Sequence, residues 1–437
     1  MAYFRIVTFG CKVNQYESAG IAEALGHRGL VPAPRDVTPD LVIVNTCTVT
    51  ARADQQARQA IRRLARQFPE ARLWVTGCYA QRAPEQIAAL PGVAQVFGNQ
   101  EKDGLPEAYC SGANPASRVH VGDFSGQEPF QACPVTHFPG HTRAWLKVQD
   151  GCNHACSYCI VPTVRGRGRS LSLEQVVSAL QSLADRGFQE VVLTGIDLGQ
   201  YGQDLRPRLS LARLLRELAP GPWPFRVRLS SVEPQGITPE LMEALSDFPP
   251  LCPHFHLPLQ SGSPAVLQAM GRPYGAKYFQ DQVLELHRRF PGAALGFDVL
   301  VGFPGETVSD FEATLNLVQT LPVAYLHVFP FSPRPGTPAQ NLARLPSPEV
   351  QSRAQQMREV GQRKKTAFYR DQVGKVGEVL VEGPYPGRPG GLKGLSANYL
   401  RVQLPGPPEW QNRRLQVKFV HLEAGILRGE VITLEEK

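Results

Sequence analysis

The first third of the chain alternates short apolar runs with longer segments of helical period. Residues 4–9, 41–44 and 73–76 are rich in β-branched and aromatic side chains, which is typical of strands buried in a parallel sheet. Between them, residues 16–29 and 51–68 predict two helices, the first of which ends at a glycine. This βαβαβ order predicts a doubly wound α/β domain.

The middle of the chain repeats the alternation with a longer period. Ser172 and Gln175 predict a capping box, and the helix that follows stops at Gly187. Residues 98–140, which separate this part from the first, are rich in Gly, Pro and Ser and predict a linker or irregular crossover. Six βα units predict a partial TIM-type barrel, with strands at 145–149, 191–194, 225–229, 255–259, 295–301 and 325–329.

The tail after residue 371 has a different pattern. Short strands at 376–382, 399–402 and 415–419, separated by Gly/Pro turns, predict a small all-β barrel. Residues 358–370 just before it predict a basic helix. A solvated helix face would explain such a run, but basic side chains on an appended β-barrel favour RNA binding. The candidate RNA-binding residues are Arg363, Lys364, Lys365, Arg370, Lys375, Arg401 and Lys418.

The overall composition limits the compartment and the partners that we expect for the protein, but it does not identify the function. The net charge of +7, from 46 basic and 39 acidic residues, permits a polyanionic partner and does not require one. No apolar stretch approaches the length that spans a bilayer, and the first residues lack a signal-peptide layout. We therefore expect a cytoplasmic protein with no membrane partner and with reduced thiols. Nine cysteines in 437 residues are an odd number and too few for a disulfide-built scaffold.

Three of these cysteines form a Cys-x3-Cys-x2-Cys run: Cys152, Cys156 and Cys159. A cubane iron–sulfur cluster normally takes four thiolates, so three close thiolates leave one iron open to a small molecule. A structural zinc site is the alternative, but it usually needs four ligands, and the only nearby imidazole is His154 inside the loop. The spacing therefore favours an iron–sulfur cluster at the end of the first barrel strand.

Three other cysteines each follow a predicted strand of the first domain: Cys11, Cys47 and Cys78. Ligands of open parallel sheets bind at the carboxyl ends of the strands, so these thiols are expected to converge. Buried cysteines acting as small apolar residues are the alternative interpretation. We expect a second metal cluster there. Cys110, Cys133 and Cys252 have no partners at ligand spacing and are treated as structural or incidental.

The run at Cys152, Cys156 and Cys159 resembles the signature of radical S-adenosylmethionine (SAM) enzymes. With three cysteines upstream and a small β-domain behind, the order resembles the methylthiotransferases over nearly the whole chain, about residues 2–434. The resemblance implies three domains. They are an N-terminal methylthiotransferase domain with an auxiliary cluster, a radical SAM core and an RNA-binding TRAM domain, over 2–125, 138–368 and 371–436.

Several blocks resemble the tRNA threonylcarbamoyladenosine branch of that family. They are Thr8-Phe9-Gly10-Cys11-Lys12-Val13-Asn14-Gln15-Tyr16-Glu17-Ser18, Asn45-Thr46-Cys47-Thr48-Val49-Thr50, Leu193-Thr194-Gly195-Ile196, His256-Leu257-Pro258-Leu259-Gln260-Ser261-Gly262 and Val301-Gly302-Phe303-Pro304-Gly305-Glu306. The implied product is 2-methylthio-N6-threonylcarbamoyladenosine at position 37, in the anticodon loop of tRNAs that decode codons beginning with A. One departure is visible near Gly168, where relatives often carry an acidic residue, and it leaves the role of the 165–170 loop open.

The resemblance also implies the cofactors: two [4Fe–4S] clusters and SAM, with an electron donor and a sulfur source of unknown identity. It implies no catalytic residue beyond the cluster ligands. Candidate SAM contacts lie where barrel strands end, at Thr194, Gly195, Ser230, Glu233, Gly302 and Gly305. Simple turn chemistry is the alternative at the glycines. His254 and His256 are expected to be core groups outside the site.

Other substrates and classes stay open at this point. The same chemistry on isopentenyladenosine 37 of tRNA, or on a ribosomal-protein aspartate, would need the same cysteines. A metal-binding RNA protein without enzymatic activity is the remaining alternative.

Overall fold

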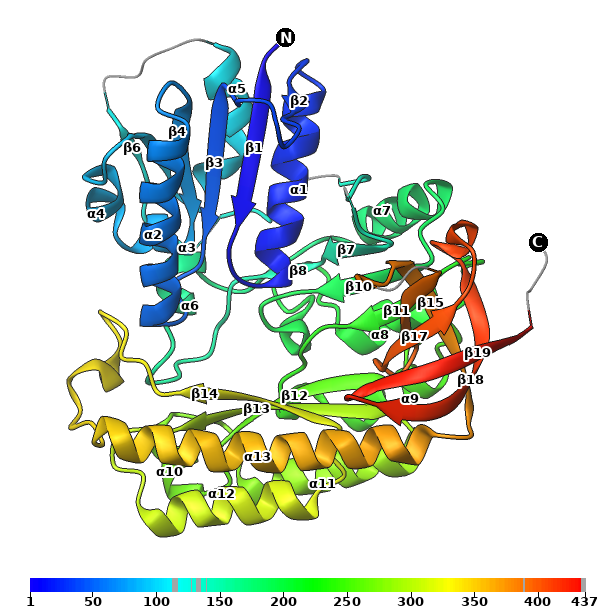
Figure 1. Ribbon diagram of the computed structural model, residues 1–437. Coiled ribbons are helices and arrows are strands. Elements are labelled where there is room, and N and C mark those ends of the chain that lie inside the picture. Colours follow the sequence, from blue (N-terminus) through cyan, green and yellow to red (C-terminus); the bar gives the residue numbers. More distant parts are fainter. Residues whose placement is uncertain (112–116, 127, 131–134, 139, 388–389, 434–437) are drawn as a thin grey trace.

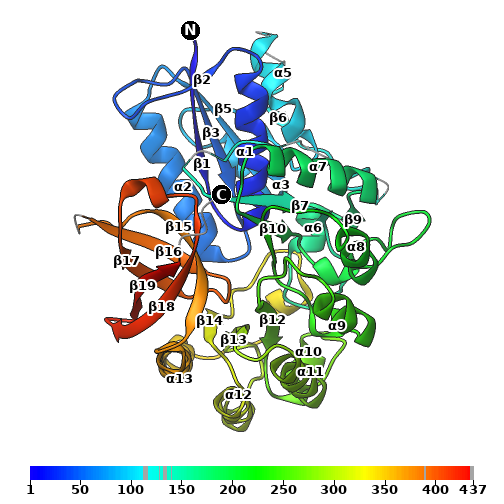
Figure 2. The same ribbon diagram turned by 90° about the vertical axis from the view of Figure 1, so that its right-hand side faces the viewer.

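The computed structural model describes residues 1–111, 117–126, 128–130, 135–138, 140–387 and 390–433. Figure 1 shows three parts: an α/β domain at the N-terminal end, a partial barrel below it, and a small β-barrel beside the partial barrel. Figure 2, turned by 90°, shows the same arrangement. Among the described helices, none combines the length and the apolar character needed to cross a lipid bilayer.

The N-terminal domain is built on a parallel sheet in the order β2-β1-β3-β4-β5-β6. Every residue of β3 is buried, as expected for a central strand covered on both faces. The predicted strands are confirmed as β1, β3 and β4, while β2, β5 and β6 were not predicted. The strands are β1 (Tyr3–Thr8), β2 (Val31–Pro32), β3 (Leu41–Thr46), β4 (Arg72–Gly77), β5 (Val93–Phe97) and β6 (Val119–His120).

The helices of this domain are α1 (Lys12–Gly26), α2 (Ala51–Gln67), α3 (Cys78–Arg82), α4 (Pro84–Ala88) and α5 (Leu105–Cys110). Helix α1 begins four residues earlier than predicted, because Gly10 turns the chain directly from strand to helix. The φ of Gly10 is +102°, and a Cβ there would lie 2.8 Å from the Cβ of Cys47. The linker expected over 98–140 is partly wrong, since α5 and β6 lie within it.

Six parallel strands form the partial barrel, as predicted. They make two three-stranded sheets, β11-β10-β7 and β12-β13-β14, joined by a bridge between Val227 and Leu251. The first strand ends at Lys147, earlier than predicted, and the short strands β8 (Gln149–Asp150) and β9 (Arg169–Ser170) pair next to it. The barrel strands are β7 (Arg143–Lys147), β10 (Glu190–Thr194), β11 (Arg226–Leu229), β12 (His254–Gln260), β13 (Ala294–Val301) and β14 (Tyr325–Pro330).

Helices cover the outside of these sheets. Both bonds of the predicted Ser172–Gln175 capping box are present, and Val176, Leu180 and Leu183 face the core. The predicted basic helix is the second half of α13, which packs along β14. The helices are α6 (Val161–Arg165), α7 (Leu173–Asp185), α8 (Leu211–Leu218), α9 (Pro239–Ser246), α10 (Pro264–Ala269), α11 (Ala276–Arg289), α12 (Val308–Thr320) and α13 (Ser347–Gln372). Short 3-10 turns span Glu101–Gly104, Leu198–Gln200, Pro234–Gly236, Pro338–Asn341 and Pro408–Trp410.

The tail is a closed barrel in the order β15-β16-β17-β19-β18. Three of its strands were predicted, but β16 and β19 were not. The strand predicted over 399–402 began too early, because Tyr399 has a φ of +69° and stands in the turn before β17. The strands are β15 (Val376–Pro384), β16 (Gly391–Ser396), β17 (Arg401–Pro405), β18 (Arg414–Glu423) and β19 (Ile426–Thr433).

A buried ionic group holds the C-terminal barrel against the partial barrel. Glu190 is 0% exposed and accepts hydrogen bonds from Arg226 and Arg228 at 2.8 Å. The same two guanidinium groups donate to backbone carbonyls of the C-terminal barrel: Arg226 to Leu395, and Arg228 to Ser396 and Ala397. Glu190 therefore compensates the cations that fix one domain to the other.

We expect Glu190→Gln to lower the free energy of unfolding by about 3–5 kcal/mol, because it leaves buried guanidinium groups without their counterion. Burial opposes ionisation of Glu190, but Arg228 and Arg226 hold its pKa well below the ordinary value of 4.5. Its stabilisation is thus present above about pH 4.5 and is lost as the pH falls below it. Urea unfolding at pH 7.5 and at pH 4 measures both effects.

The matched control is Glu240→Gln, which removes an exposed carboxylate paired with Arg216. Its effect should stay below about 1 kcal/mol at either pH. Equal losses in the two variants would mean that Glu190 does not carry the domain contact.

Candidate functional site

The loop with Cys152, Cys156 and Cys159 leaves the barrel after β8 and runs to α6. Its entry requires glycine, since Gly151 has a φ of +72° and a Cβ there would lie 2.0 Å from the carbonyl oxygen of Arg167. The backbone N–H of Cys152 donates to the carbonyl of Gly166 at 3.1 Å. These contacts hold the loop at the carboxyl ends of the barrel strands, where barrel enzymes place their chemistry.

Hydrogen-bond donors surround the sulfur atoms of this loop. The Arg272 Nη1 lies 3.3 Å from the Sγ of Cys156, and the backbone N–H of His154 lies 3.4 Å from the Sγ of Cys152. Burial raises the pKa of Cys152 to about 12 and that of Cys159 to about 11. Thiolates therefore form here only when a cation compensates them, as iron would. Free thiols that are partly or fully buried and have N–H donors aimed at them fit an iron–sulfur cluster.

A cavity of about 340 Å³ lies over the loop. All three cysteines line it, together with Glu233 and Arg272 from the barrel. Arg272 pairs with Glu233 and also donates to the hydroxyl of Tyr274 at 2.9 Å. Burial raises the pKa of Glu233 to about 7. The cavity also reaches the N-terminal domain, whose Val49 and Thr50 form part of its wall.

The second cysteine set lies on that N-terminal side. Cys11, Cys47 and Cys78 follow β1, β3 and β4, which are adjacent in the sheet, and Figure 1 shows these strand ends directed at the partial barrel. Burial and, to a smaller extent, the neighbouring thiols of Cys78 and Cys11 together raise the pKa of Cys47 to about 12. The Asn99 Nδ2 lies 3.7 Å from the Sγ of Cys78. The structure thus gathers the three thiols at one edge.

Neither cysteine set is arranged around a single metal ion. A tetrahedral zinc ion with Zn–S bonds of about 2.3 Å needs sulfur atoms about 3.8 Å apart. Among the described residues, the groups of three ligand atoms that all lie within 4.8 Å of one another are Cys152–His154–Asp197 and His256–Asp298–His327. In neither cysteine set, therefore, do all three sulfur atoms lie within 4.8 Å of one another.

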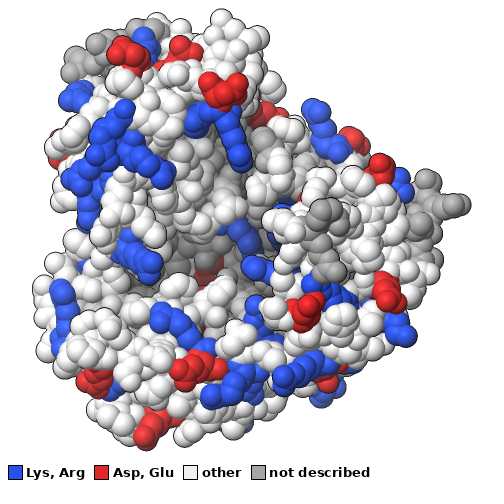
Figure 3. Space-filling model, viewed as in Figure 1, with Lys and Arg blue, Asp and Glu red and all other residues white. Residues whose placement is uncertain are grey.

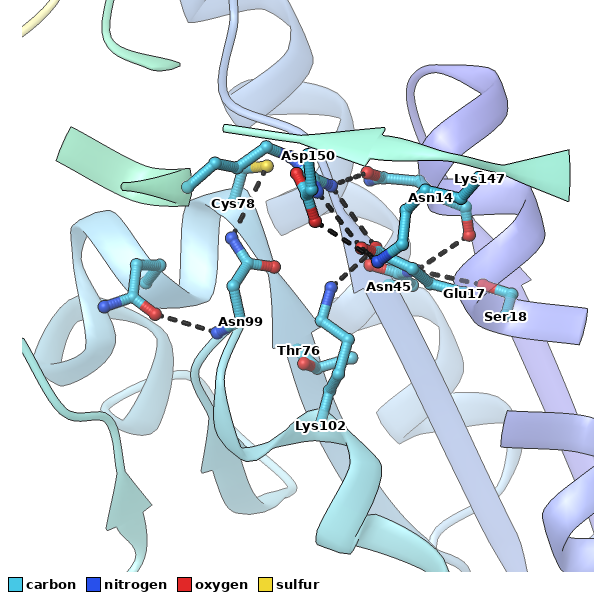
Figure 4. A network of polar contacts seen from close by, with 12 residues as sticks. Asn14, Glu17, Ser18, Asn45, Thr76, Cys78, Asn99, Lys102, Lys147 and Asp150 are labelled. Atoms are coloured by element: carbon cyan, nitrogen blue, oxygen red, sulfur yellow. Dashed lines mark hydrogen bonds and ion pairs between the residues drawn. The ribbon is translucent and has the colours of Figure 1, made fainter. Parts of the chain in front are cut away.

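A buried ionic network connects the two cysteine sets (Figure 4). The Arg165 guanidinium donates to Asn14, Glu17 and Asp150. Asn14 lies 3.7 Å from the Sγ of Cys11, and Asp150 accepts the N–H of Gly151 at 2.8 Å, one residue before Cys152. Lys102 and Lys147 complete the network around Glu17. Sequence reasoning missed this network, because its residues are far apart in the chain.

The loop whose role the sequence left open supports the cysteines. The N–H of Gly168 donates to the Oδ1 of Asn153 at 3.0 Å, and a Cβ at Gly168 would lie 3.0 Å from the same side chain. An acidic side chain at Gly168 would therefore crowd Asn153. The 165–170 loop fixes the cysteine loop in place and contributes Arg165 to the network.

Of the predicted SAM contacts, Glu233 lines the cavity. Ser230 accepts the N–H of Gly195 at 3.4 Å, next to the buried Thr194 at the end of β10. Gly302 donates to Glu306, and a Cβ there would lie 2.6 Å from Val350 of α13. Gly305 has open space around it. Thr194, Gly195, Ser230, Gly302 and Gly305 are not part of the cavity wall, so their contact with SAM stays a prediction.

Several residues of the cavity wall were not foreseen, notably Arg272, Asp197 and Asp298. His154 pairs with Asp197 at 2.9 Å, and His256 pairs with Asp298 at 2.9 Å. For Asp197 and Asp298 the signal in the sequence is only a polar residue in or after an apolar strand, and Arg272 follows helix α10 with no such signal. His254 and His256, which the sequence prediction left out of the site, both contact the hydroxyl of Tyr325 in the core. Because His256 also pairs with Asp298, it connects the core to the cavity wall.

Two family models match the chain. Residues 3–98 match the uncharacterized protein family UPF0004, and residues 146–318 match the radical SAM superfamily. A Thermotoga maritima protein named threonylcarbamoyladenosine tRNA methylthiotransferase MtaB is 35% identical over 439 residues, covering 100% of this chain and 99% of that protein. A Bacillus subtilis protein of the same name is 40% identical over 346 residues, 78% of this chain and 76% of its own length.

The chain belongs to the methylthiotransferase family of radical SAM enzymes. A second group of relatives in this family carries a different name. A Carboxydothermus hydrogenoformans protein named tRNA-2-methylthio-N(6)-dimethylallyladenosine synthase is 33% identical, over 98% of this chain and 99% of that protein. Among solved structures, the radical SAM methyltransferase TsrM from Kitasatospora setae aligns with a TM-score of 0.58 and 18% identity, over 78% of this chain and 77% of that chain, which is a likeness of fold.

The predicted RNA-binding residues of this methylthiotransferase are spread over α13 and the C-terminal barrel. Lys365 and Arg401 meet, together with Arg358, in a cavity of about 370 Å³ between α13, β14 and the barrel. Lys364 instead donates to the carbonyl of Leu321 at 2.8 Å, and Lys375 pairs with Asp371. Arg363, Arg370 and Lys418 are exposed. Figure 3 shows Lys and Arg side chains along the hollow between the three parts.

Proposed function

We propose that this enzyme inserts sulfur and a methyl group at C2 of N6-threonylcarbamoyladenosine 37 in the anticodon loop of tRNA. The observation that carries the proposal is the full-length similarity to a relative named for this substrate. The cavity over Cys152, Cys156 and Cys159, which Val49 and Thr50 of the N-terminal domain also line, supports it. Relatives named for threonylcarbamoyladenosine are 35–40% identical, whereas those named for dimethylallyladenosine are 32–33% identical. The ribosomal-protein substrate has no observation in its favour.

The residues fit the cofactors of the family. Cys152, Cys156 and Cys159 would hold one [4Fe–4S] cluster with SAM beside it, and Cys11, Cys47 and Cys78 would hold the auxiliary cluster. Once bound, the cluster and SAM supply the radical chemistry that an unactivated adenine C2–H requires, and an external electron donor and sulfur source would support repeated turnover. The protein's contribution is to position the cofactors and the substrate, to exclude water and to set the charge around the sulfur atoms.

The chain's own residues perform these tasks at identifiable atoms. Arg272 donates to the Sγ of Cys156 and is held in place by Glu233, so it fixes the ligand geometry. Arg334 of the barrel donates to the hydroxyl of Thr48, one residue after Cys47, at 3.0 Å and pairs with Asp54. That contact clamps the N-terminal domain over the cavity, which limits the entry of water.

The tRNA would lie along the hollow between the three parts. Adenosine 37 must leave its stack to reach the cavity, while phosphates on either side are held by basic side chains. Lys365 and Arg401 are the predicted residues best placed for this, because they face the same open space. The exposed Arg363, Arg370 and Lys418 would extend the same surface.

Replacing Lys365 and Arg401 together with Gln should weaken tRNA binding by on the order of tenfold at physiological salt. The slope of log K against log salt should become shallower by about 1.5 to 2, since two phosphate contacts are lost. Fluorescence anisotropy with a labelled tRNA at several salt concentrations measures both quantities.

The matched control removes two charges elsewhere, with Lys277→Gln and Arg288→Gln on α11, where both cations are exposed and paired within the helix. That variant should bind as the wild type does. An equal loss in both variants would show a general charge effect and would contradict a specific role for the α13–barrel cavity.

Mass spectrometry of tRNA nucleosides from a deletion strain tests the substrate. We expect the 2-methylthio-threonylcarbamoyl nucleoside to disappear, its unmethylthiolated precursor to accumulate, and the gene to restore the product. If that nucleoside persists and the 2-methylthio-isopentenyl nucleoside is lost instead, the substrate of the enzyme is isopentenyladenosine 37 of tRNA.

A further inference from the structure

Lys12 stands between the auxiliary cysteine site and the barrel. It is the first residue of α1 and directly follows Cys11. Its side chain is half-buried, and it lies close enough to Arg228, Arg143 and His254 for the charges of these groups to affect one another. Lys12 therefore lies next to a predicted ligand of the auxiliary cluster, where the N-terminal domain meets the barrel strands.

The ammonium group of Lys12 has no partner among the described residues: neither an ion pair nor a hydrogen bond involves it. Glu190, the carboxylate whose charge acts on Lys12, is already engaged by Arg226 and Arg228. Lys12 thus leaves an uncompensated positive charge in a partly desolvated place, which favours binding of an anion.

The other largely buried cations beside the two cysteine sites are engaged. Arg165 and Lys102 contact Glu17, Arg272 pairs with Glu233, and Arg334 pairs with Asp54. Each of these would have to give up an existing partner to bind a substrate anion. Lys12 would not.

The geometry of adenine places the N6 substituent near Lys12. In adenine, C2 and N6 flank N1 on the same edge of the ring, the edge by which flipped-out bases are recognised. If C2 approaches the sulfur held by Cys11, Cys47 and Cys78, the group on N6 must lie close to the same cysteines. A threonylcarbamoyl group ends in a carboxylate, whereas a dimethylallyl group is uncharged.

We propose that Lys12 binds the carboxylate of the N6-threonylcarbamoyl group and thereby selects this base over adenosines with uncharged N6 substituents. This inference rests on the proposed function and names the contact that reads its substrate. An ion pair to a charged group in such a partly buried place is worth about tenfold to a hundredfold in affinity.

The test compares two anticodon stem-loop RNAs that differ in one group. One carries threonylcarbamoyladenosine at position 37, and the other carries the same nucleoside with the threonine carboxylate replaced by a neutral carboxamide. Anaerobic fluorescence anisotropy gives the Kd of each RNA for the reconstituted wild type and for Lys12→Gln. We expect the wild type to prefer the acid by about tenfold to a hundredfold, and Lys12→Gln to bind both RNAs alike.

Two further variants make the result specific. Lys12→Arg keeps the charge and should keep a preference for the acid. Lys277→Gln removes an exposed lysine of α11 that pairs with Asp281 and should behave as the wild type. Iron content, measured for every variant, should stay unchanged in Lys12→Gln.

Three results would overturn the assignment. Lys12→Gln could retain the preference for the acid, could lose affinity for both RNAs equally, as a phosphate contact would, or could lose iron, as a contact that supports the cluster would. Failure of the proposed function is distinguishable from all three, because the wild type itself would then bind threonylcarbamoyl and unmodified stem-loops equally.

Discussion

Replacing Cys156 with Ala should reduce the reductive cleavage of SAM to background. The Sγ of Cys156 accepts the hydrogen bond from Arg272 and lines the cavity with Cys152 and Cys159. Its loss removes one of three ligands, and no other cysteine of the described residues lines that cavity. Production of 5′-deoxyadenosine under strong chemical reduction measures the effect. The auxiliary site should remain loaded, because its thiols come from other strands.

Cys110→Ala is the control for this variant. Cys110 is an exposed free thiol at the end of α5, and its removal should leave SAM cleavage at the wild-type rate. Wild-type cleavage by the Cys156 variant would contradict the assignment of the 152–159 loop.

Replacing Cys47 with Ala should separate the two halves of the reaction. We expect SAM to be cleaved but no methylthio group to appear on the RNA, because the auxiliary site loses a ligand while the radical SAM loop keeps all three. Cys47 is buried, and the thiols of Cys78 and Cys11 lie close enough to raise its pKa. Assaying 5′-deoxyadenosine and the methylthiolated nucleoside in the same reaction gives both quantities.

Cys252→Ala removes a thiol that is equally buried but belongs to neither set. It should methylthiolate normally, which separates loss of a ligand from loss of core packing. Full methylthiolation by the Cys47 variant would refute a second cluster.

The positions of the cysteines at the strand ends could be predicted from the sequence, because these positions depend on short-range signals. Apolar runs of four to seven residues marked β1, β3, β4 and the barrel strands, and a cysteine after each of the first three could only lie at their carboxyl ends. Strands without a clean apolar run escaped prediction. β16 contains Gly391 and Gly394, and its stability comes from closure of the barrel, which a local pattern does not express.

The buried polar contacts that support the site could not be predicted from the sequence in the same way. Arg165, Glu17 and Lys102 come from three separate elements, and Arg165 reaches Glu17 only when the two α/β domains pack together. A charged residue in a sequence is most often at the surface, so burial of these three reverses the usual expectation. Arg272 is a similar case: it lies just after α10, and only the fold brings it to the Sγ of Cys156.

This buried network has a consequence for how the two sites are held. Glu17 accepts from Lys102, Lys147 and Arg165, and these cations hold the pKa of its carboxyl well below the ordinary range although burial opposes this. Because Arg165 also contacts Asn14 and Asp150, the loops of Cys11 and Cys152 share one rigid support. The two sites are therefore positioned relative to each other by the same set of ion pairs.

The central claim is that two separate sets of cysteines each hold a cluster. Counting iron per chain after anaerobic reconstitution tests it in four proteins: the wild type, Cys156→Ala, Cys47→Ala and the double variant. We predict about eight irons in the wild type, about four in each single variant and almost none in the double variant. An unchanged count in either single variant, or loss of all iron from one substitution, would contradict the claim.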